Sequence, residues 1–340
     1  MLQQHTQPAE SPVRSSMPTS LVWLDPHAAL RRAYAANRAL TLLGVLMLAT
    51  LAVCLIGLIV DPRVITGAPA WLKPTKFAIS IALYSFTLQW MLSFVEGRRF
   101  WVRMVSIISL LGIMIEMIGI ITQVLRGTTS HFNVGTAFDA ALFSTMGLVI
   151  VVIWVMNLVA AVLLLIQRLP DSAFAWSLRL ALLLTLVGAG LGVLMTRPNP
   201  AQLEAMRAHQ PVSIVGAHSV GVADGGPGLP VTGWSTTGGD LRIGHFVGLH
   251  SLQVLPFVGW LLMRRRATRR LRGGQRVALV WVAAFSYLGL IALVTWQALR
   301  GQPLIAPDAT TLAAAGAWLG VTILSGGAVI GQRRAISDGR

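Results

Sequence analysis

The sequence predicts an all-α integral membrane protein, and three observations support that prediction. Of the 340 residues, 55% are hydrophobic and only 11% are charged, whereas soluble domains carry about a quarter of charged residues. The mean hydropathy is +0.70. Apolar runs long enough to cross about 30 Å of hydrocarbon as helices recur along the chain. Soluble, disordered, collagen-like and disulfide-stabilised classes are therefore excluded.

Eight apolar runs are expected to cross the membrane as helices. They cover about 39–60, 77–95, 102–123, 139–166, 174–195, 244–263, 275–297 and 309–331. The first four form membrane half 1 (39–166) and the last four form membrane half 2 (174–331). A polar N-terminal segment (1–38) and a short tail (332–340) flank them. Residues 1–20 are expected to be disordered, and residues 21–38, with Trp23, to lie as a helix on the membrane surface.

The basic residues predict the orientation of these helices. The net charge is +15, from 27 basic and 12 acidic residues. With the N-terminus in the cytoplasm, 19 basic residues fall on the cytoplasmic side and 8 on the outer side, as the positive-inside rule requires. We therefore expect a multi-pass protein of the inner (cytoplasmic) membrane with both termini inside. This location explains the charge better than a nucleic-acid partner does, and the sequence leaves protein partners unknown.

Short matches suggest an internal repeat of four helices. The segment Gln123–Gly127 matches Gln297–Gly301, Asp139 matches Asp308, and Lys73-x-x-Lys76 matches Arg242-x-x-His245. A repeat of four helices restores the same orientation, so the halves would be parallel and related by an axis along the membrane normal. We treat two tandem four-helix repeats as a hypothesis.

One acidic residue lies where lipid tolerates it least. Glu116 sits near the middle of the third span, where a carboxylate costs at least about 2.5 kcal/mol. It must therefore face protein or water. Gln123 follows seven residues later, nearly two helical turns, so the two side chains are expected to share one face. This face is predicted to line the interior of the bundle, with Glu116 either a neutral interhelical acid or a proton acceptor.

Basic residues at the outer helix ends suggest a ligand site. Lys73 and Lys76 are the only lysines in an arginine-rich chain, which hints at a site that needs a compact ammonium group. With them we group as ligand-binding candidates Glu116, Gln123, Arg126, Asp139, Arg242 and Arg300, and we expect Asp139, Asp240 and Asp308 to orient the cations. The first hypothesis is a transporter-like or ligand-binding protein that takes an anionic small molecule or a lipid head group.

Three histidines support a second hypothesis. His131, His245 and His250 are cofactor-binding candidates for a membrane redox protein with b-type haem, or with a metal ion together with Asp139 or Asp240. A third hypothesis is a non-catalytic subunit of a membrane complex. An enzyme acting on lipid, with Glu116, Asp139 or His250 as acid or base, also stays open. The sequence contains no recognisable catalytic motif such as GxSxG or HExxH.

The loop 197–243 is the one long hydrophilic segment between spans. It is rich in glycine, contains His209 and His218, and is expected to form a short helix at 200–209 and loop elsewhere. It is predicted to be either a lid over the outer site or a mobile insertion. Glycines next to it, Gly188, Gly190, Gly192, Gly244 and Gly248, are expected to permit close helix packing.

Overall fold

The computed structural model describes residues 26–332, which form mainly α-helices. Seven helices in this range are long and apolar enough to cross a membrane. They are α2 (Arg38–Val60), α4 (Arg99–Leu125), α5 (Ala137–Ile166), the consecutive helices α6 (Ser172–Gly190) and α7 (Gly192–Met195), α9 (Arg242–Met263), α11 (Gly273–Leu299) and α12 (Ala309–Gly331). The chain is therefore an all-α, multi-pass membrane protein, as its composition predicts.

The second predicted span corresponds to α3 (Leu72–Leu92), which is not one of those seven helices. It begins at Leu72 and not at residue 77, so Lys73 and Lys76 lie within its first turns. Pro74 is compatible with this start, because backbone N–H groups in the first turn have no partner within a helix. These lysines make α3 more polar than the helices around it.

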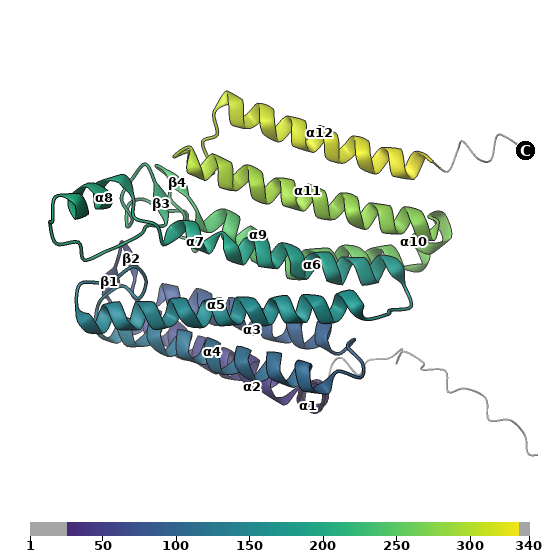
Figure 1. Ribbon diagram of the computed structural model, residues 1–340, viewed down its shortest axis with the longest axis horizontal. Helices are drawn as coiled ribbons and strands as arrows, with labels where there is room; N and C mark the ends of the chain where they lie inside the picture. Colours follow the sequence, from purple (N-terminus) through teal and green to yellow (C-terminus); the bar gives the residue numbers. More distant parts are fainter. Residues whose placement is uncertain (1–25, 333–340) are drawn as a thin grey trace, which may run out of the picture.

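The long helices run side by side and are connected at two ends (Figure 1). The loop end carries the hairpin of β1 (Val64–Ile65) and β2 (Ala68–Pro69), the short helix α8 (Pro200–Arg207) and the paired strands β3 (Ser219–Val220) and β4 (Gly239–Asp240). The opposite end, called the α10 end, carries α10 (Arg265–Arg270), α1 (Pro26–Ala36) and the end of α12.

The helices form two groups that follow the chain. In the first group α2 packs on α3 and α4, and α4 packs on α3 and α5. In the second group α6 packs on α9 and α11, and α11 packs on α9 and α12. Contacts of α5 with α6 and of α3 with α9 join the groups. At the edge, α12 lies on α11, and the most apolar stretch of α12 has no buried residue.

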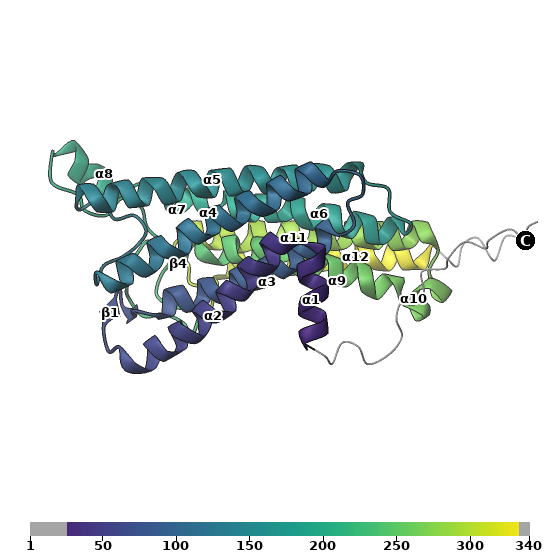
Figure 2. The ribbon, with the colours of Figure 1, turned by 90° about the horizontal axis from the view of Figure 1, so that it is seen from below.

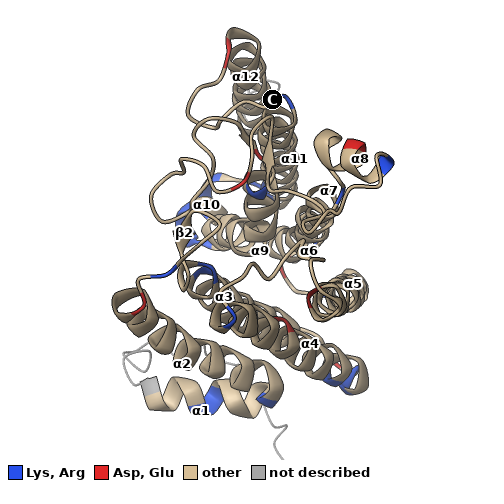
Figure 3. Cartoon of the chain, turned by 90° about the vertical axis from the view of Figure 1, so that its left-hand side faces the viewer, with Lys and Arg blue, Asp and Glu red and all other residues tan. Residues whose placement is uncertain are grey.

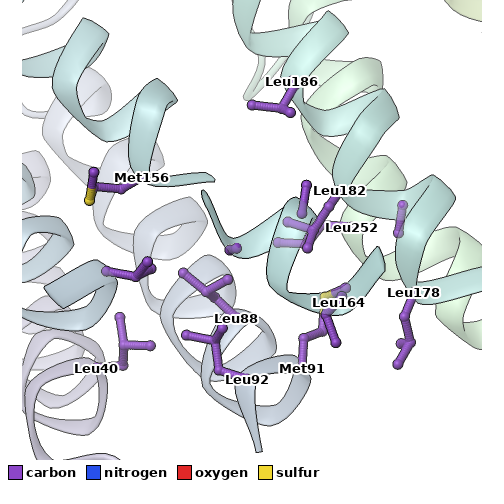
Figure 4. Packing of buried hydrophobic residues seen from close by; sticks show 14 of the residues in the cluster. Leu40, Leu88, Met91, Leu92, Met156, Leu164, Leu178, Leu182, Leu186 and Leu252 are labelled. Atoms are coloured by element: carbon purple, nitrogen blue, oxygen red, sulfur yellow. The ribbon is translucent and has the colours of Figure 1, made fainter. Parts of the chain in front are cut away.

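The buried apolar core extends through both groups. Figure 4 shows Leu88 and Met91 of α3, Leu164 of α5, Leu182 of α6 and Leu252 of α9 in one cluster. Because lipid tails are as apolar as leucine, helix association in a membrane depends on close packing and interhelical hydrogen bonds more than on the hydrophobic effect.

The closest helix contact lies between α6 and α9. A Cβ atom on Gly188 would lie 2.5 Å from Cα of Gly248, so the two backbones touch. A Cβ on Gly244 would meet Thr295 of α11. These glycines pack closely, as predicted. The prediction is wrong for Gly190, because a Cβ there would meet no described atom within 4 Å.

The helix α1 lies across the direction of the long helices (Figure 2). Asn37 caps α2 by accepting a hydrogen bond from the backbone N–H of Leu40, and Gln89 of α3 donates to the carbonyl of Ala33 in α1. Residues 26–36 of the predicted 21–38 surface helix therefore form a helix that is separate from α2. The predictions for residues 1–20, for Trp23 and for most of the tail 332–340 fall outside the described residues.

The long loop 197–243 is folded against the helices of the loop end. Its backbone joins the loop between α4 and α5, because Val134 N–H donates to the Ser213 carbonyl and Val215 N–H donates to the Phe132 carbonyl, both at 2.8 Å. Helix α8 covers most of the predicted 200–209 helix. Figure 3, which looks onto the loop end, shows the loops crossing the helix ends, with acidic and basic segments on α8 and on the neighbouring loops.

Candidate functional site

Buried and partly buried ionisable side chains meet at the loop end, where four segments come together. The start of α3 contributes Lys73, the half of α4 nearer the loop end contributes Glu116, and the α4–α5 loop contributes His131. The long loop adds His218. The first three side chains form a continuous chain of polar contacts.

His131 is the middle member of this chain. Its Nδ1 lies 3.1 Å from Nζ of Lys73 and 3.0 Å from Oγ of Ser130. Its Nε2 lies 3.4 Å from Oε1 of Glu116. The side chain of Glu116 is only 3% exposed, and its second oxygen has no hydrogen-bond partner among the described residues. An ammonium, an imidazole and a buried carboxyl group are thus connected in series.

The local backbone and three aromatic rings hold His131 in place. The following residue, Phe132, has φ = 66°, a left-handed conformation that costs a non-glycine residue about 1–2 kcal/mol. The imidazole lies 6.1, 6.2 and 6.4 Å from the rings of Phe77, Phe132 and Phe143. Surrounding packing must maintain this conformation, which is typical of a constrained functional position.

The surroundings of His131 keep its ring neutral. Burial lowers the pKa of His131 well below its usual value, and the positive charge of Lys73 lowers it further, with smaller effects from His218 and His245. A neutral imidazole has one nitrogen that donates and one that accepts. His131 can therefore bridge Lys73 and Glu116 in either tautomer.

The long loop supplies a second histidine beside this chain. The ring of His218 packs 4.9 Å from the ring of Phe132, and its Nδ1 lies 2.8 Å from Oδ2 of Asp224. Burial lowers the pKa of His218, although the hydrogen bond to Asp224 acts in the opposite direction. Burial alone would raise the pKa of Asp224, but His218 and two backbone N–H groups hold it well below its usual range.

The same loop contacts the second lysine of α3. Nζ of Lys76 donates to the carbonyl of Thr232 at 2.9 Å. Arg242, at the start of α9, donates to the carbonyl of Gly233 at 2.6 Å and pairs with the fully buried carboxylate of Asp240. The segment 232–240 is thus fixed over the starts of both α3 and α9.

The arginines of the predicted ligand site are paired with aspartates. Arg126 lies 3.2 Å from Asp139, which also accepts a hydrogen bond from Gln123 at 2.7 Å. Arg242 pairs with Asp240 as above, and Arg300 lies 2.6 Å from Asp308. In contrast, neither lysine forms a salt bridge within the described part of the chain. The ion pairs there include Arg63–Asp61, Arg126–Asp139, His131–Glu116, His218–Asp224, Arg242–Asp240, Arg276–Asp171 and Arg300–Asp308.

The three histidines of the cofactor hypothesis have separate partners. His245 Nδ1 lies 2.8 Å from the carbonyl of Gly188, and His250 Nδ1 lies 3.1 Å from Gln253. His131, His218 and His245 are close enough to interact electrostatically. Across residues 26–332, no group of three or more His, Cys, Asp or Glu side chains could hold a metal ion. Haem binding stays a prediction.

One face of α4 carries unpaired polar atoms at regular spacing. Ser109, Glu116 and Gln123 are seven residues apart, and each is at most 2% exposed. Each has one oxygen without a hydrogen-bond partner in the described range. The position of Glu116 and Gln123 on the buried face of α4 agrees with the sequence prediction. Arg300 and Asp308 lie at the α11–α12 connection, apart from this face.

Sequence reasoning did not select His218 and Asp224 as site residues. His218 directly precedes β3 and Asp224 directly precedes Gly225, so both lie in the irregular loop, and no helical period relates them to α4. The signal that could have found them is a histidine and an aspartate in the one hydrophilic loop that follows a span end.

Two open grooves lie away from this site. One, of about 420 Å³, is lined by Arg266, Arg270, Leu271 and Ile330 at the α10 end. The other, of about 330 Å³, lies along Phe100, Arg103 and Met104 at the start of α4. Both are shallow, open to the side of the bundle and mainly apolar, so they suit lipid contact better than chemistry.

Comparison with known proteins gives no relative for the chain. No protein-family model matches it, and neither a curated protein nor a solved structure matches it.

Proposed function

We propose that this protein is transporter-like or ligand-binding, with a site for an anionic small molecule or lipid head group at the loop end. The observation that carries this proposal is the contrast between the cations there. Arg126, Arg242 and Arg300 are each neutralised by an aspartate, whereas Lys73 and Lys76 form no such pair within residues 26–332.

Two physical arguments favour an anion beside the lysines. They are three residues apart in the first turns of α3, so both ammonium groups lie on one side of the helix. The N-terminus of a helix this long also carries a partial positive charge that attracts anions. The carbonyls of the long loop already accept from Lys76, so an anion would replace a neutral contact and not a salt bridge.

The proposal includes the topology predicted from the sequence. We infer that α3 is the eighth span, that the loop end is extracytoplasmic and that both termini are cytoplasmic. The α10 end carries the arginine-rich segment 264–276, in agreement with the positive-inside rule.

The tandem repeat belongs to the same proposal, and matching local geometry supports it. Gly127 and Gly301 end α4 and α11 with φ of 72° and 73°. In both cases the residue after this glycine donates its backbone N–H to a glutamine carbonyl, at 3.0 Å for Gln123 and 3.2 Å for Gln297. The preceding arginine pairs in each case with an aspartate at the next helix. Corresponding helices also pack in the same pairs within the two groups.

Ligand binding can be tested by thermal unfolding of the purified protein in detergent with acetate, citrate and inorganic phosphate. We expect at least one anion to raise the Tm of the wild type. The shift should be lost in Lys73→Ala and Lys76→Ala, and retained in Arg207→Ala, which removes an exposed cation from α8 at the same end. Equal shifts in all four proteins, or no shift with any anion, would contradict the proposal.

The orientation has its own test. Cys54 is buried, so cysteines introduced as Arg207→Cys and Arg270→Cys can be labelled selectively in intact cells with a membrane-impermeant thiol reagent. Labelling of position 207 alone is expected. Labelling of position 270 alone would show that the protein has the opposite orientation and would contradict the proposal.

A further inference from the structure

The series Lys73–His131–Glu116 has the connectivity of a proton relay. If the Lys73 ammonium donates to Nδ1 of His131, then Nε2 carries the ring hydrogen and faces the Glu116 carboxylate. If Lys73 is neutral, it accepts from Nδ1–H, and a protonated Glu116 donates to Nε2. The two arrangements differ only in the positions of two hydrogen atoms.

Conversion between these arrangements is balanced. The N–H bond at Nζ of Lys73 breaks as one forms at Nδ1 of His131. The N–H bond at Nε2 breaks as an O–H bond forms at Oε1 of Glu116. One proton has moved from the lysine to the carboxyl group, the imidazole has changed tautomer, and the total charge of the three groups is unchanged. The neutral state of His131 suits this step, because no imidazolium has to form.

The surroundings favour proton exchange at Glu116 over a purely structural role. A structural carboxylate at this depth needs hydrogen-bond donors for both oxygens, since an unsatisfied buried charge is costly. One oxygen of Glu116 has no donor among the described residues, while His131 contacts the other. On the same face of α4, Ser109 lies toward the α10 end beside Tyr84, whose hydroxyl donates to Asn157 at 3.1 Å. Polar groups therefore continue inward from the carboxyl group.

We propose that Lys73 and His131 carry protons between the loop end and Glu116, which serves as the proton-accepting group inside the first helix group. This inference rests on the proposed function, because ligand binding or transport supplies the reason for a proton to move. It deepens that function by naming the proton as the ion that accompanies the ligand. Other charged groups act on the relay. Lys76, Arg242 and Asp224 influence Lys73, and His218 and His245 influence His131.

Infrared spectroscopy of the protein in lipid, without any added anion, tests the relay. A protonated, buried Glu116 should give a carbonyl band that disappears in Glu116→Gln and persists in Glu204→Gln, an exposed acid of α8. When the medium is changed to D₂O, this band should shift rapidly in the wild type. His131→Gln, which keeps a hydrogen bond but cannot exchange tautomers, should slow the shift by at least about 100-fold, as expected on removal of a positioned proton carrier.

A second variant covers the case in which His131→Gln does not fold. Lys73→Met removes the outer member of the relay and should slow the exchange similarly, whereas Arg207→Met removes an exposed cation and should not. A band that Glu116→Gln leaves in place, or wild-type exchange in both relay variants, would overturn the inference. Because no anion is present, failure here leaves the anion-induced Tm shift standing, and an absent Tm shift leaves the infrared result standing.

Discussion

Replacement of Gly188 by alanine should separate α6 from α9. The added Cβ would lie 2.5 Å from Cα of Gly248 and 2.7 Å from the backbone nitrogen of Leu249. Ordinary carbon contacts are about 3.5–4.0 Å, so the helices must move apart by about 1 Å. The obstructing atoms belong to the backbone and cannot rotate away as a side chain would.

The expected cost follows from two contributions. Overpacking of a closely packed site costs about 1–3 kcal/mol. Separation also lengthens hydrogen bonds that cross the same interface: Thr185–Ser251 at 2.9 Å, Ser251 to the Ala181 carbonyl at 3.0 Å, and His245 with the Gly188 carbonyl at 2.8 Å. Interhelical hydrogen bonds in membranes contribute about 0.6 kcal/mol each. Gly188→Ala should therefore lower the free energy of unfolding by about 2–4 kcal/mol.

The matched control is Gly190→Ala, two residues along the same helix. A Cβ at position 190 meets no described atom within 4 Å, and alanine favours a helix over glycine, so stability should be unchanged or slightly increased. The assay is reversible unfolding by SDS in mixed micelles, followed by circular dichroism. Equal unfolding free energies for the two variants, within about 0.5 kcal/mol, would refute the reasoning, since independent surface changes stay within that limit.

Three further predictions concern the loop end. Because the pKa of His131 is lower in the folded than in the unfolded protein, its contribution to stability is present above about pH 6.5 and is lost as the pH falls, by about 1.4 kcal/mol per unit of pKa difference. Unfolding by SDS between pH 7.5 and 5 should show this loss, and His131→Gln should make the unfolding free energy less dependent on pH. Asp240→Asn leaves the guanidinium of Arg242 without its fully buried partner and should lower the free energy of unfolding by about 2–4 kcal/mol. Asp308→Asn, in an exposed pair, should change it little, and a larger loss for Asp308→Asn than for Asp240→Asn would contradict this ranking. Gly67 has φ = 70° and abuts the backbone of the long loop at Gly225, so Gly67→Ala should accelerate cleavage within 208–241 by a protease of broad specificity without altering global unfolding, and unchanged cleavage would count against that contact.

The helices were predictable because each one is determined by a local feature of the sequence, a run of apolar residues of sufficient length. The ends were less accurate: the lysines of α3 interrupt the apolar run at residue 77, although the helix begins at Leu72. The shared face of Glu116 and Gln123 was also predictable, since helical geometry fixes it without reference to any neighbour.

The partners within the site could not be predicted in the same way. The contact of His131 with Glu116 and Lys73 depends on how a loop folds between helices, and the apolar face of a helix does not determine which helix packs against it. The sequence grouped His131 with His250, but His250 bonds to Gln253 on its own helix. His218 entered the site because the long loop folds back onto Phe132, a tertiary contact without a sequence period.

The marginal position of α12 has a consequence for biosynthesis. The polar groups discussed at the loop end, from Lys73 to Arg242, are all translated before this helix begins at Ala309. Because α12 packs extensively only on α11 and its apolar stretch has no buried residue, its insertion adds little to the geometry around Glu116. The nascent chain can thus complete the interior of the first helix group while the C-terminal helix is still within the ribosome or the insertion machinery.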